Sequence, residues 1–254
     1  MNDTRGRLIA GNWKMHGNIA FVENFSNEIV KLASGFKWRN LELLLCPPGP
    51  YLKTICDILA STSICVGGQD CHADRNGAYT GDVSVEMLVD VGCKYVITGH
   101  SERRDRHGEP NGLVRRKTTA AQTGGLIPIL CVGEKLEDRK RGDAVETILR
   151  QLKECLPEAS SGKNIVVAYE PVWAIGTGKI PKISEIAEVH LAIREALYDL
   201  VSDPESLRIL YGGSVKPDNA EDILCVSNVD GALVGGASLK TDDFWSIVEA
   251  CWQD

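Results

Sequence analysis

The stretch IVVAYEPVWAIGTGKIP, residues 165–181, is the most informative segment for the fold of this chain. Four apolar residues and a tyrosine lead directly into Glu170, and Pro171, Trp173 and a Gly-Thr-Gly tripeptide follow. A carboxyl group at the mouth of a buried strand is costly to desolvate unless the protein uses its charge. The stretch therefore predicts a buried strand that delivers a carboxylate to a glycine-containing loop.

Seven further runs share the apolar, β-branched character of residues 165–169. They are residues 7–12, 41–46, 63–68, 95–98, 127–132, 208–211 and 231–234. Continuous apolar runs without strict polar alternation are typical of strands buried on both faces, as in parallel sheets. Amphipathic stretches of helical length lie between the runs, notably residues 143–156, 183–201 and 242–252.

The stretch 183–201 is the clearest predicted helix. We expect Ser184 to be its N-cap. Its predicted apolar face consists of Ile186, Val189, Ile193, Ala196, Leu197 and Leu200.

The spacing of the predicted strands indicates the fold class. Successive strands start 22 to 43 residues apart, with no linker or low-complexity break between them. Eight βα units in a chain of 254 residues match a (β/α)8 barrel, which we predict as a single domain over residues 1–254. The alternative is a doubly wound open sheet. It is disfavoured because AGNWKMHG, and no Gly-x-Gly-x-x-Gly, follows the first strand.

Charge and apolar content exclude some classes of function. The formal net charge of −7 argues against a general nucleic-acid-binding surface, although one pocket can still be locally positive. No apolar run approaches the ~20 residues needed to span a bilayer. The first residues lack the apolar stretch of a secretory signal, so we expect a cytoplasmic protein without membrane or nucleic-acid partners.

The cysteines are interpreted as reduced thiols. Nine are present, an odd number, and none are spaced as Cys-x-x-Cys. Cys46, Cys65 and Cys131 lie in apolar runs and are expected to be small core residues.

In a barrel of this kind the chemistry lies on the loops that follow the strands. Polar or glycine-rich segments follow five of the predicted strands, and they contain Asn12 and Lys14, then His100, Ser101 and Glu102, then Glu170, then residues 212–214, and finally residues 235–238. Because the carboxyl ends of the strands meet at one rim, we expect these groups to converge there.

Each converging group has a chemical and an ordinary interpretation. Glu170, kept dry beside Trp173, would gain basicity and act as a general base, but it could equally be a solvated glutamate or part of an ion pair. His100 precedes a short helix whose positive end would keep the imidazole neutral, although a lone histidine is more often structural. Lys14 could bind an anion, neutralise developing charge or form a Schiff base, or be a surface lysine.

The glycines complete the predicted site. Glycine pairs after the seventh and eighth strands would let backbone amides approach a phosphate, although such pairs usually mark turns. Residues 171–179 are expected to form a lid with a tip freed by Gly176 and Gly178. Together these groups indicate proton abstraction next to the carbonyl of a small phosphorylated sugar, through an enediolate. His16, His72, His107 and His190 lack metal-ligand spacing and no nucleotide motif appears, so we expect no metal and no cofactor.

Five motifs carry a family resemblance. AGNWKM, GHSERR, AYEPVWAIGTGK, YGGSV and LVGGASL, in this order and over nearly the whole chain, resemble the triosephosphate isomerase family. That family is itself the reference example for a glutamate base paired with a neutral histidine. The resemblance implies interconversion of dihydroxyacetone phosphate and glyceraldehyde 3-phosphate, in glycolysis, gluconeogenesis and the pentose shunt.

The resemblance also implies a role for each matching residue. Glu170 would be the base and neutral His100 the electrophile, with Asn12 and Lys14 polarising and holding the substrate. The expected phosphate-binding residues are Gly176, Ser214, Gly235 and Gly236. The expected supporting residues are Ser101, Glu102, Tyr211 and Thr80, of which Tyr211, with Ser214, would latch the closed lid.

A homodimer is implied as well, formed by the loop after the third strand, residues 70–84. Thr80 would brace Asn12 and Lys14 of the partner. Two positions depart from the family pattern. Asp82 replaces the commoner glutamate that pairs with Arg103 across the interface, and Ile180-Pro181 forms an unusual second hinge of the lid, where proline restricts the backbone.

Three other functions are compatible with parts of this pattern. An isomerase of a four-carbon ketose phosphate would use the same residues, and side-by-side kinetics would separate it. A Schiff-base aldolase using Lys14 would be trapped by borohydride. A non-catalytic barrel would tolerate loss of Glu170 or His100, and both are present.

Overall fold

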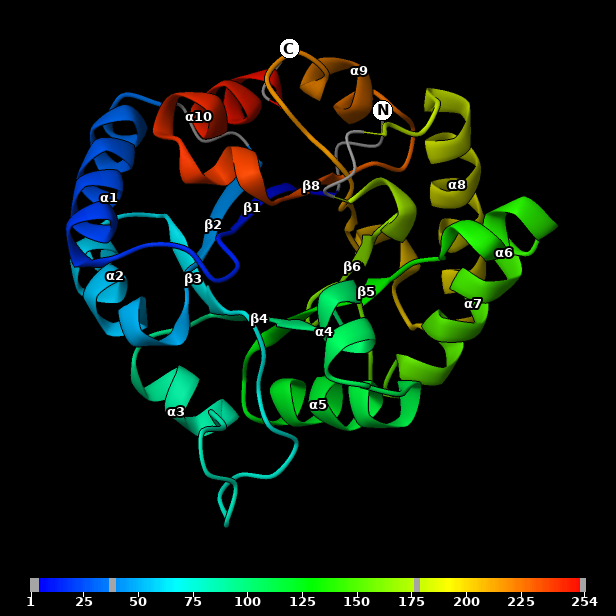
Figure 1. The fold of residues 1–254 in the computed structure, drawn as a ribbon, viewed down its shortest axis with the longest axis horizontal. Helices are drawn as coiled ribbons and strands as arrows, with labels where there is room; N and C mark the ends of the chain where they lie inside the picture. The colour runs from blue at the N-terminus through cyan, green and yellow to red at the C-terminus, as the bar shows by residue number, and fades with distance from the viewer. Residues whose placement is uncertain (1–4, 37–39, 176–178, 252–254) are drawn as a thin grey trace.

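A closed barrel of eight parallel strands forms the centre of the computed structural model, which describes residues 5–36, 40–175 and 179–251. Each strand pairs with the next along the chain, and β1 pairs with β8 to close the ring. Figure 1, which looks down the barrel, shows the helices as an outer ring. The predicted (β/α)8 barrel is confirmed, and the open-sheet alternative is wrong because β1 and β8 are paired.

The strands match the predicted runs closely. They are β1 (Arg7–Asn12), β2 (Leu41–Cys46), β3 (Cys65–Gly68), β4 (Tyr95–Thr98), β5 (Ile127–Val132), β6 (Val166–Tyr169), β7 (Ile209–Tyr211) and β8 (Gly231–Val234). The predicted third, sixth and seventh strands begin one or two residues later than expected. Apolar character continues into the preceding loop there, so composition does not mark where strand pairing starts.

The helices that cover the barrel are α1 (Ile19–Ser34), α2 (Leu52–Leu59), α3 (Val85–Asp90), α4 (Ser101–Arg106), α5 (Asn111–Thr123), α6 (Leu136–Arg141), α7 (Ala144–Cys155), α8 (Ile183–Leu200), α9 (Ala220–Leu224) and α10 (Thr241–Ala250). Short 3-10 segments are η1 (Gly49–Tyr51), η2 (Val172–Ala174), η3 (Pro204–Ser206) and η4 (Gly236–Leu239). No helix among the described residues combines the length and apolar character needed to cross a membrane.

The start of α8 corrects one expectation. The helix begins at Ile183, so Ser184 lies inside its first turn and is not the N-cap. The N-cap is Lys182, whose backbone N–H donates to the Glu185 carboxylate at 2.7 Å. The carboxylate of a glutamate in the first turn thus accepts the free N–H at the start of the helix, and no capping hydroxyl is required.

Two apolar layers stabilise the barrel. Inside it, twelve buried residues from the strands, among them Cys46 and Cys131, form one cluster. A larger cluster fills the space between strands and helices, and it includes the predicted α8 residues Ile186, Val189 and Ile193. All nine cysteines are free, but Cys65, predicted to be a core residue, is only partly buried and contacts Glu42. Core packing thus accounts for Cys46 and Cys131.

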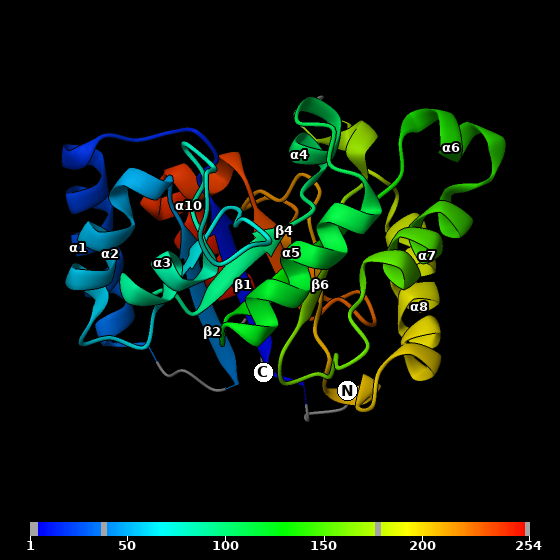
Figure 2. The ribbon, with the colours of Figure 1, turned by 90° about the horizontal axis from the view of Figure 1, so that it is seen from below.

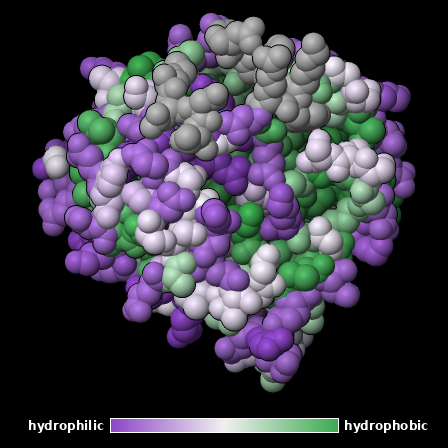
Figure 3. Space-filling model, turned by 180° about the vertical axis from the view of Figure 1, so that it is seen from behind, coloured by the Kyte–Doolittle hydropathy of each residue, from purple (hydrophilic) through white to green (hydrophobic). Residues whose placement is uncertain are grey.

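The two ends of the barrel differ in role. Figure 2 shows α4, which follows β4, at one end. At the opposite end, where the strands begin, hydrophilic side chains cover much of the surface (Figure 3). There Glu42 of β2 accepts hydrogen bonds from Lys94 at 2.7 Å and Arg208 at 2.9 Å, and also from Tyr95. These contacts join β2 to the starts of β4 and β7.

Glu42→Gln is expected to lower the free energy of unfolding by about 2 kcal/mol at pH 7, because it removes a partly buried charge from its cationic partners. Burial alone would raise the pKa of Glu42, but hydrogen bonds from Lys94, Tyr95 and Arg208 lower it to about 2. A depressed pKa stabilises the fold above the unfolded-state pKa near 4.5, and this contribution is lost as the pH falls toward 2.

Urea denaturation at pH 7, 5 and 3.5 checks this prediction. The difference between wild type and Glu42→Gln should be constant from pH 7 to 5 and smaller at pH 3.5. Glu23→Gln, on the exposed surface of α1, is the control. A difference that grows on acidification would contradict the assignment.

Candidate active site

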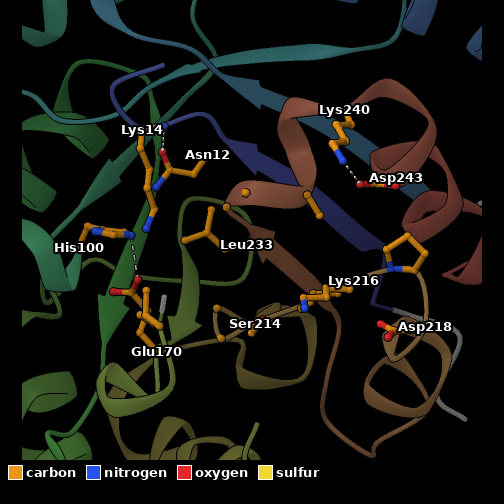
Figure 4. Close-up of a pocket in the computed structure, with 18 residues that line it drawn as sticks. Asn12, Lys14, His100, Glu170, Ser214, Lys216, Asp218, Leu233, Lys240 and Asp243 are labelled. Carbon is orange, nitrogen blue, oxygen red and sulfur yellow. Dashed lines mark hydrogen bonds and ion pairs between the residues drawn. The ribbon is translucent and has the colours of Figure 1, made fainter. Parts of the chain in front are cut away.

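A cavity of about 530 Å³ opens where the strands end. Its lining includes the predicted residues Asn12, Lys14, His100, Glu170, Ser214, Gly235 and Gly236. Figure 4 shows Lys14, His100 and Glu170 together on one side of this cavity, and Ser214 farther along it. The lining also contains residues that the sequence analysis did not single out, namely Lys216, Asp218, Lys240 and Asp243. These predicted residues therefore lie around one cavity at the end of the barrel where the strands end.

Glu170 lies at the end of β6, and both of its carboxylate oxygens are engaged. Oε1 lies 2.9 Å from Nε2 of His100, and Oε2 accepts the backbone N–H of Ser101 at 2.8 Å. The residue is 1% exposed, as predicted for a carboxylate kept from water. Ser101, expected only as a supporting residue, thus contacts the carboxylate directly.

The expected net rise in the basicity of Glu170 is not found in this arrangement. Burial is the largest single effect and raises the pKa of Glu170. The charge and hydrogen bond of His100, the amide of Ser101 and the charge of Lys14 together outweigh it, so the net pKa lies below the ordinary value. The carboxylate is stabilised in its ionised form and has reduced basicity while it keeps these partners.

His100 is the N-cap of α4. Its Nδ1 accepts the backbone N–H of Glu102 at 3.2 Å, so this nitrogen carries no proton and Nε2–H points to Glu170. Burial is the largest single effect and lowers the pKa of His100, but the charge and hydrogen bond of Glu170 and the charge of Glu102 together outweigh it, so the net pKa lies above the ordinary value. The contacts are those of a neutral imidazole, but the helix end alone does not determine its protonation, because the ionised glutamate favours the proton.

Lys14 has a left-handed backbone conformation, with φ of 52°. Its N–H donates to the Asn12 side chain at 3.0 Å, and its carbonyl accepts from the Gln69 side chain at 2.8 Å. Its ammonium group contacts Glu102 at 2.6 Å, in line with the supporting role predicted for Glu102. Gln69 was missed because it lies 55 residues from Lys14 and no local pattern marks it. These contacts hold Lys14 in a strained backbone conformation that directs its side chain toward Glu170.

Two glycines allow the backbone to pack closely against Glu170. A Cβ at Gly133, directly after β5, would lie 1.8 Å from the carbonyl oxygen of Glu170, and a Cβ at Gly212 would lie 3.0 Å from its Cγ. Gly133 was missed as well, although it stands in the CVGE segment directly after the fifth predicted strand. Only glycine permits this close approach of the backbones.

The base of the predicted lid is tied to Glu134, another residue that the sequence analysis did not name. Glu134 is fully buried, and its Oε1 accepts from Trp173 Nε1 at 2.8 Å and from the Tyr169 hydroxyl at 3.2 Å. Tyr211, the predicted latch, is also buried, and its hydroxyl has no hydrogen-bond partner among the described residues. Gly176 and Gly178 lie outside the described residues.

A family model described as triosephosphate isomerase matches residues 7–251. The chain belongs to the triosephosphate isomerase family. The predicted family and the predicted enzyme class, an isomerase, are thereby confirmed.

Individual members of the family are similar over nearly the whole chain. The triosephosphate isomerase of Afipia carboxidovorans is 48% identical, over 96% of this chain and 97% of that protein. That of a Ruegeria species is 50% identical, over 96% of this chain and 97% of that protein. The crystal structure of triosephosphate isomerase from Bartonella henselae has a TM-score of 0.88 at 41% identity, over 96% of this chain and 98% of that one.

The segment that the family resemblance assigns to the dimer projects from the barrel. Figure 1 shows the loop between β3 and α3 extending beyond the ring of helices. Thr80 is exposed on this loop and does not line the cavity. Asp82 lies 3.6 Å from Nε2 of His72. Arg103 already contacts Asp70 at 2.9 Å and Glu109 at 2.7 Å within the chain, so a pair with the partner's Asp82 would have to add to these contacts.

In the part of the chain that the structure describes, no group of three or more His, Cys, Asp or Glu side chains is placed to hold a metal ion.

Proposed function

We propose that the protein interconverts dihydroxyacetone phosphate and D-glyceraldehyde 3-phosphate through an enediolate, with Glu170 as general base and His100 as electrophile. The observation that carries the proposal is the contact between these two side chains, with Lys14 beside them in the same cavity. Family membership supports the overall reaction. The residue roles rest on the geometry.

The proposed reaction transfers one carbon-bound proton. Glu170 removes a proton from the carbon next to the carbonyl group, and the electron pair of the broken C–H bond forms the enediolate double bond. Nε2–H of His100 and the ammonium group of Lys14 stabilise the negative charge that develops on oxygen, while Asn12 helps to orient the substrate. Glu170 then returns the proton to the neighbouring carbon, while the hydroxyl proton on the first carbon passes to the oxygen of the second, so that the carbonyl group forms on the first carbon.

Glu170 has to leave its present partners to perform this step. The contacts with His100 and Ser101 lower its pKa, so breaking them when substrate enters would restore the basicity that a dry carboxylate has. Pro171 follows Glu170 directly and leads into η2, where Trp173 is bonded to Glu134. Closing the lid would therefore move Glu170. The Tyr211 hydroxyl, which has no partner within the described ranges, would receive the closed lid together with Ser214.

The phosphate group is assigned to the opposite part of the cavity. Ser214, Gly235 and Gly236 line it, and glycines let backbone N–H groups approach a phosphate without steric hindrance. Gly176 of the lid would add a further amide.

We further propose a cytoplasmic homodimer that assembles through residues 70–84, with Thr80 near Asn12 and Lys14 of the partner. Exposed apolar side chains on this loop and on α3 directly after it support the interface, namely Tyr79, Val83 and Met87. An apolar surface of this kind is typical of a protein–protein contact.

Turnover tests the proposed function. Glyceraldehyde 3-phosphate should be converted rapidly to dihydroxyacetone phosphate in a metal-chelating buffer without added cofactor, and faster than a four-carbon ketose phosphate is isomerised. Glu170→Gln is the matched control and should be inactive. If a folded dimer does not convert glyceraldehyde 3-phosphate, the triose assignment is overturned in favour of the four-carbon substrate. If the inactive protein is a monomer, the result would instead indicate a defective interface at Asp82.

A further inference from the structure

One arginine holds the backbone on both sides of His100. Arg104 lies in the first turn of α4, and its side chain folds back over the start of this helix. Its Nε donates to the Gly99 carbonyl at 2.8 Å, and its backbone N–H donates to the His100 carbonyl at 3.0 Å. Because peptide groups are planar, these two bonds fix the orientation of both peptide planes next to His100. The direction in which the imidazole leaves the backbone is fixed with them.

The same guanidinium joins this segment to β5. Its Nη2 donates to the carbonyl of Cys131 at 3.2 Å. The next carbonyl along β5, that of Val132, accepts the N–H of Glu170 at 2.8 Å. One strand of the barrel therefore connects Arg104 to the backbone that carries Glu170. The two side chains held in this way meet at 2.9 Å, between Nε2 of His100 and Oε1 of Glu170.

The guanidinium group of Arg104 is itself fixed by its surroundings. Nη1 donates to Oδ1 of Asn111, the first residue of α5, at 2.6 Å, and Nη2 lies 3.4 Å from Sγ of Cys155. Gly99 has a φ of 66°, and a Cβ there would lie 3.0 Å from Nη2 and 2.6 Å from Val114. The planar fork thus bonds to partners on several elements at once, which an ammonium group cannot do in the same geometry.

We propose that Arg104 is a positioning residue for the proposed isomerisation, which sets the place of the His100 imidazole and, through β5, its spacing from Glu170. The proposal rests on the proposed function. Arg104 is not among the residues that line the cavity, so it acts through His100 and does not touch the substrate. Groups that perform chemistry have to be held within about 0.5 Å, and a displacement of about 1 Å can lower a rate by about 10²-fold.

Arg104→Lys tests the proposal by kinetics. Lysine keeps the positive charge but cannot bond to two carbonyl groups in the fixed plane of a guanidinium. We expect kcat per folded molecule to fall by about 10- to 100-fold, with KM changed by less than about threefold, because the glycines assigned to phosphate are not bonded to Arg104. Urea denaturation gives the folded fraction. Arg115→Lys is the matched control, since Arg115 lies on α5 and pairs with the exposed Glu158.

The Nε2–H proton of His100 provides a readout that needs no substrate. In ¹⁵N-labelled wild type it should give a resolved NMR signal, because the proton is buried and bonded to Glu170. In Arg104→Lys the signal should shift or broaden. His100→Gln lacks the proton and assigns the signal. If wild type fails to convert the triose phosphate, the proposed function fails, whereas this signal still decides whether Arg104 positions the imidazole.

Asn111→Ala gives a milder test, because it removes only a partner that orients the guanidinium. We expect kcat to fall by about three- to tenfold, and the double variant with Arg104→Lys to be no slower than Arg104→Lys alone, since Asn111 acts through Arg104. A wild-type kcat and an unshifted His100 signal in Arg104→Lys, or a loss confined to KM, would overturn the proposal. If Arg104→Lys does not fold, the same results in Asn111→Ala would overturn it.

Discussion

Glu170→Asp is expected to lower kcat by about 10³-fold while KM changes by no more than a few-fold. Aspartate retains the charge but shortens the side chain by one methylene, which withdraws the base from the carbon that carries the proton. The part of the cavity proposed to bind phosphate, around Ser214 and Gly235, should retain its affinity. The loss should therefore appear in the proton-transfer step.

Steady-state kinetics in both directions measure this effect, and the binding of a non-reacting phosphorylated ligand reports the phosphate site separately. Glu23→Asp, on the exposed face of α1, controls for the chemical change alone. Turnover close to that of wild type in Glu170→Asp would remove Glu170 from the role of base. A loss confined to KM would make it a binding residue instead.

Gly133→Ala is expected to lower the free energy of unfolding by more than about 4 kcal/mol, because the added Cβ would lie 1.8 Å from the carbonyl oxygen of Glu170. Gly133 has little room to move, since its N–H and C=O are both bonded to the Gln151 side chain at 2.9 Å. The strain must therefore displace the end of β6, and with it Glu170. Any folded fraction should also lose activity.

Urea denaturation and the specific activity of the soluble fraction measure these effects. Gly112→Ala is a matched control, because a Cβ there meets nothing within 4 Å and alanine favours the helix α5. If the free energy of unfolding of Gly133→Ala lies within about 1 kcal/mol of the wild-type value, the backbone at residue 133 accommodates a Cβ beside Glu170 more easily than the structure indicates. A stable but inactive variant would assign Gly133 to the positioning of Glu170 alone.

The barrel could be predicted from the sequence because its signal is local and repeated. Each strand is a short apolar run, and the run at residues 127–132 coincides with β5. The spacing of the runs requires a helical crossover between parallel strands, which gives the order of the elements. The position of Asn12, Lys14, His100 and Glu170 directly after their strands then places them at one rim. The order of the five motifs along the chain then predicted the family.

Three features depended on contacts between distant parts of the chain. The Gln69 side chain donates to the Lys14 carbonyl, and Glu134 accepts from Trp173. Gly133 leaves room for the carbonyl group of Glu170. Local periodicity marks none of these pairs. The cap of α8 was misassigned for a different, local reason, since Glu185 in the first turn replaces a capping hydroxyl. Residue type gives the chemistry that a group can perform, but its partners come from the fold.

The protonation of the central pair shows this division most clearly. Local patterning was enough to predict that a carboxylate and an imidazole follow two strands of one barrel, because a local pattern sets where a strand ends. That His100 and the Ser101 amide lower the pKa of Glu170 despite its burial follows only from the folded molecule. Burial depends on how apolar a segment is, whereas the opposing charges and hydrogen bonds depend on which side chains the closed barrel brings within 3 Å.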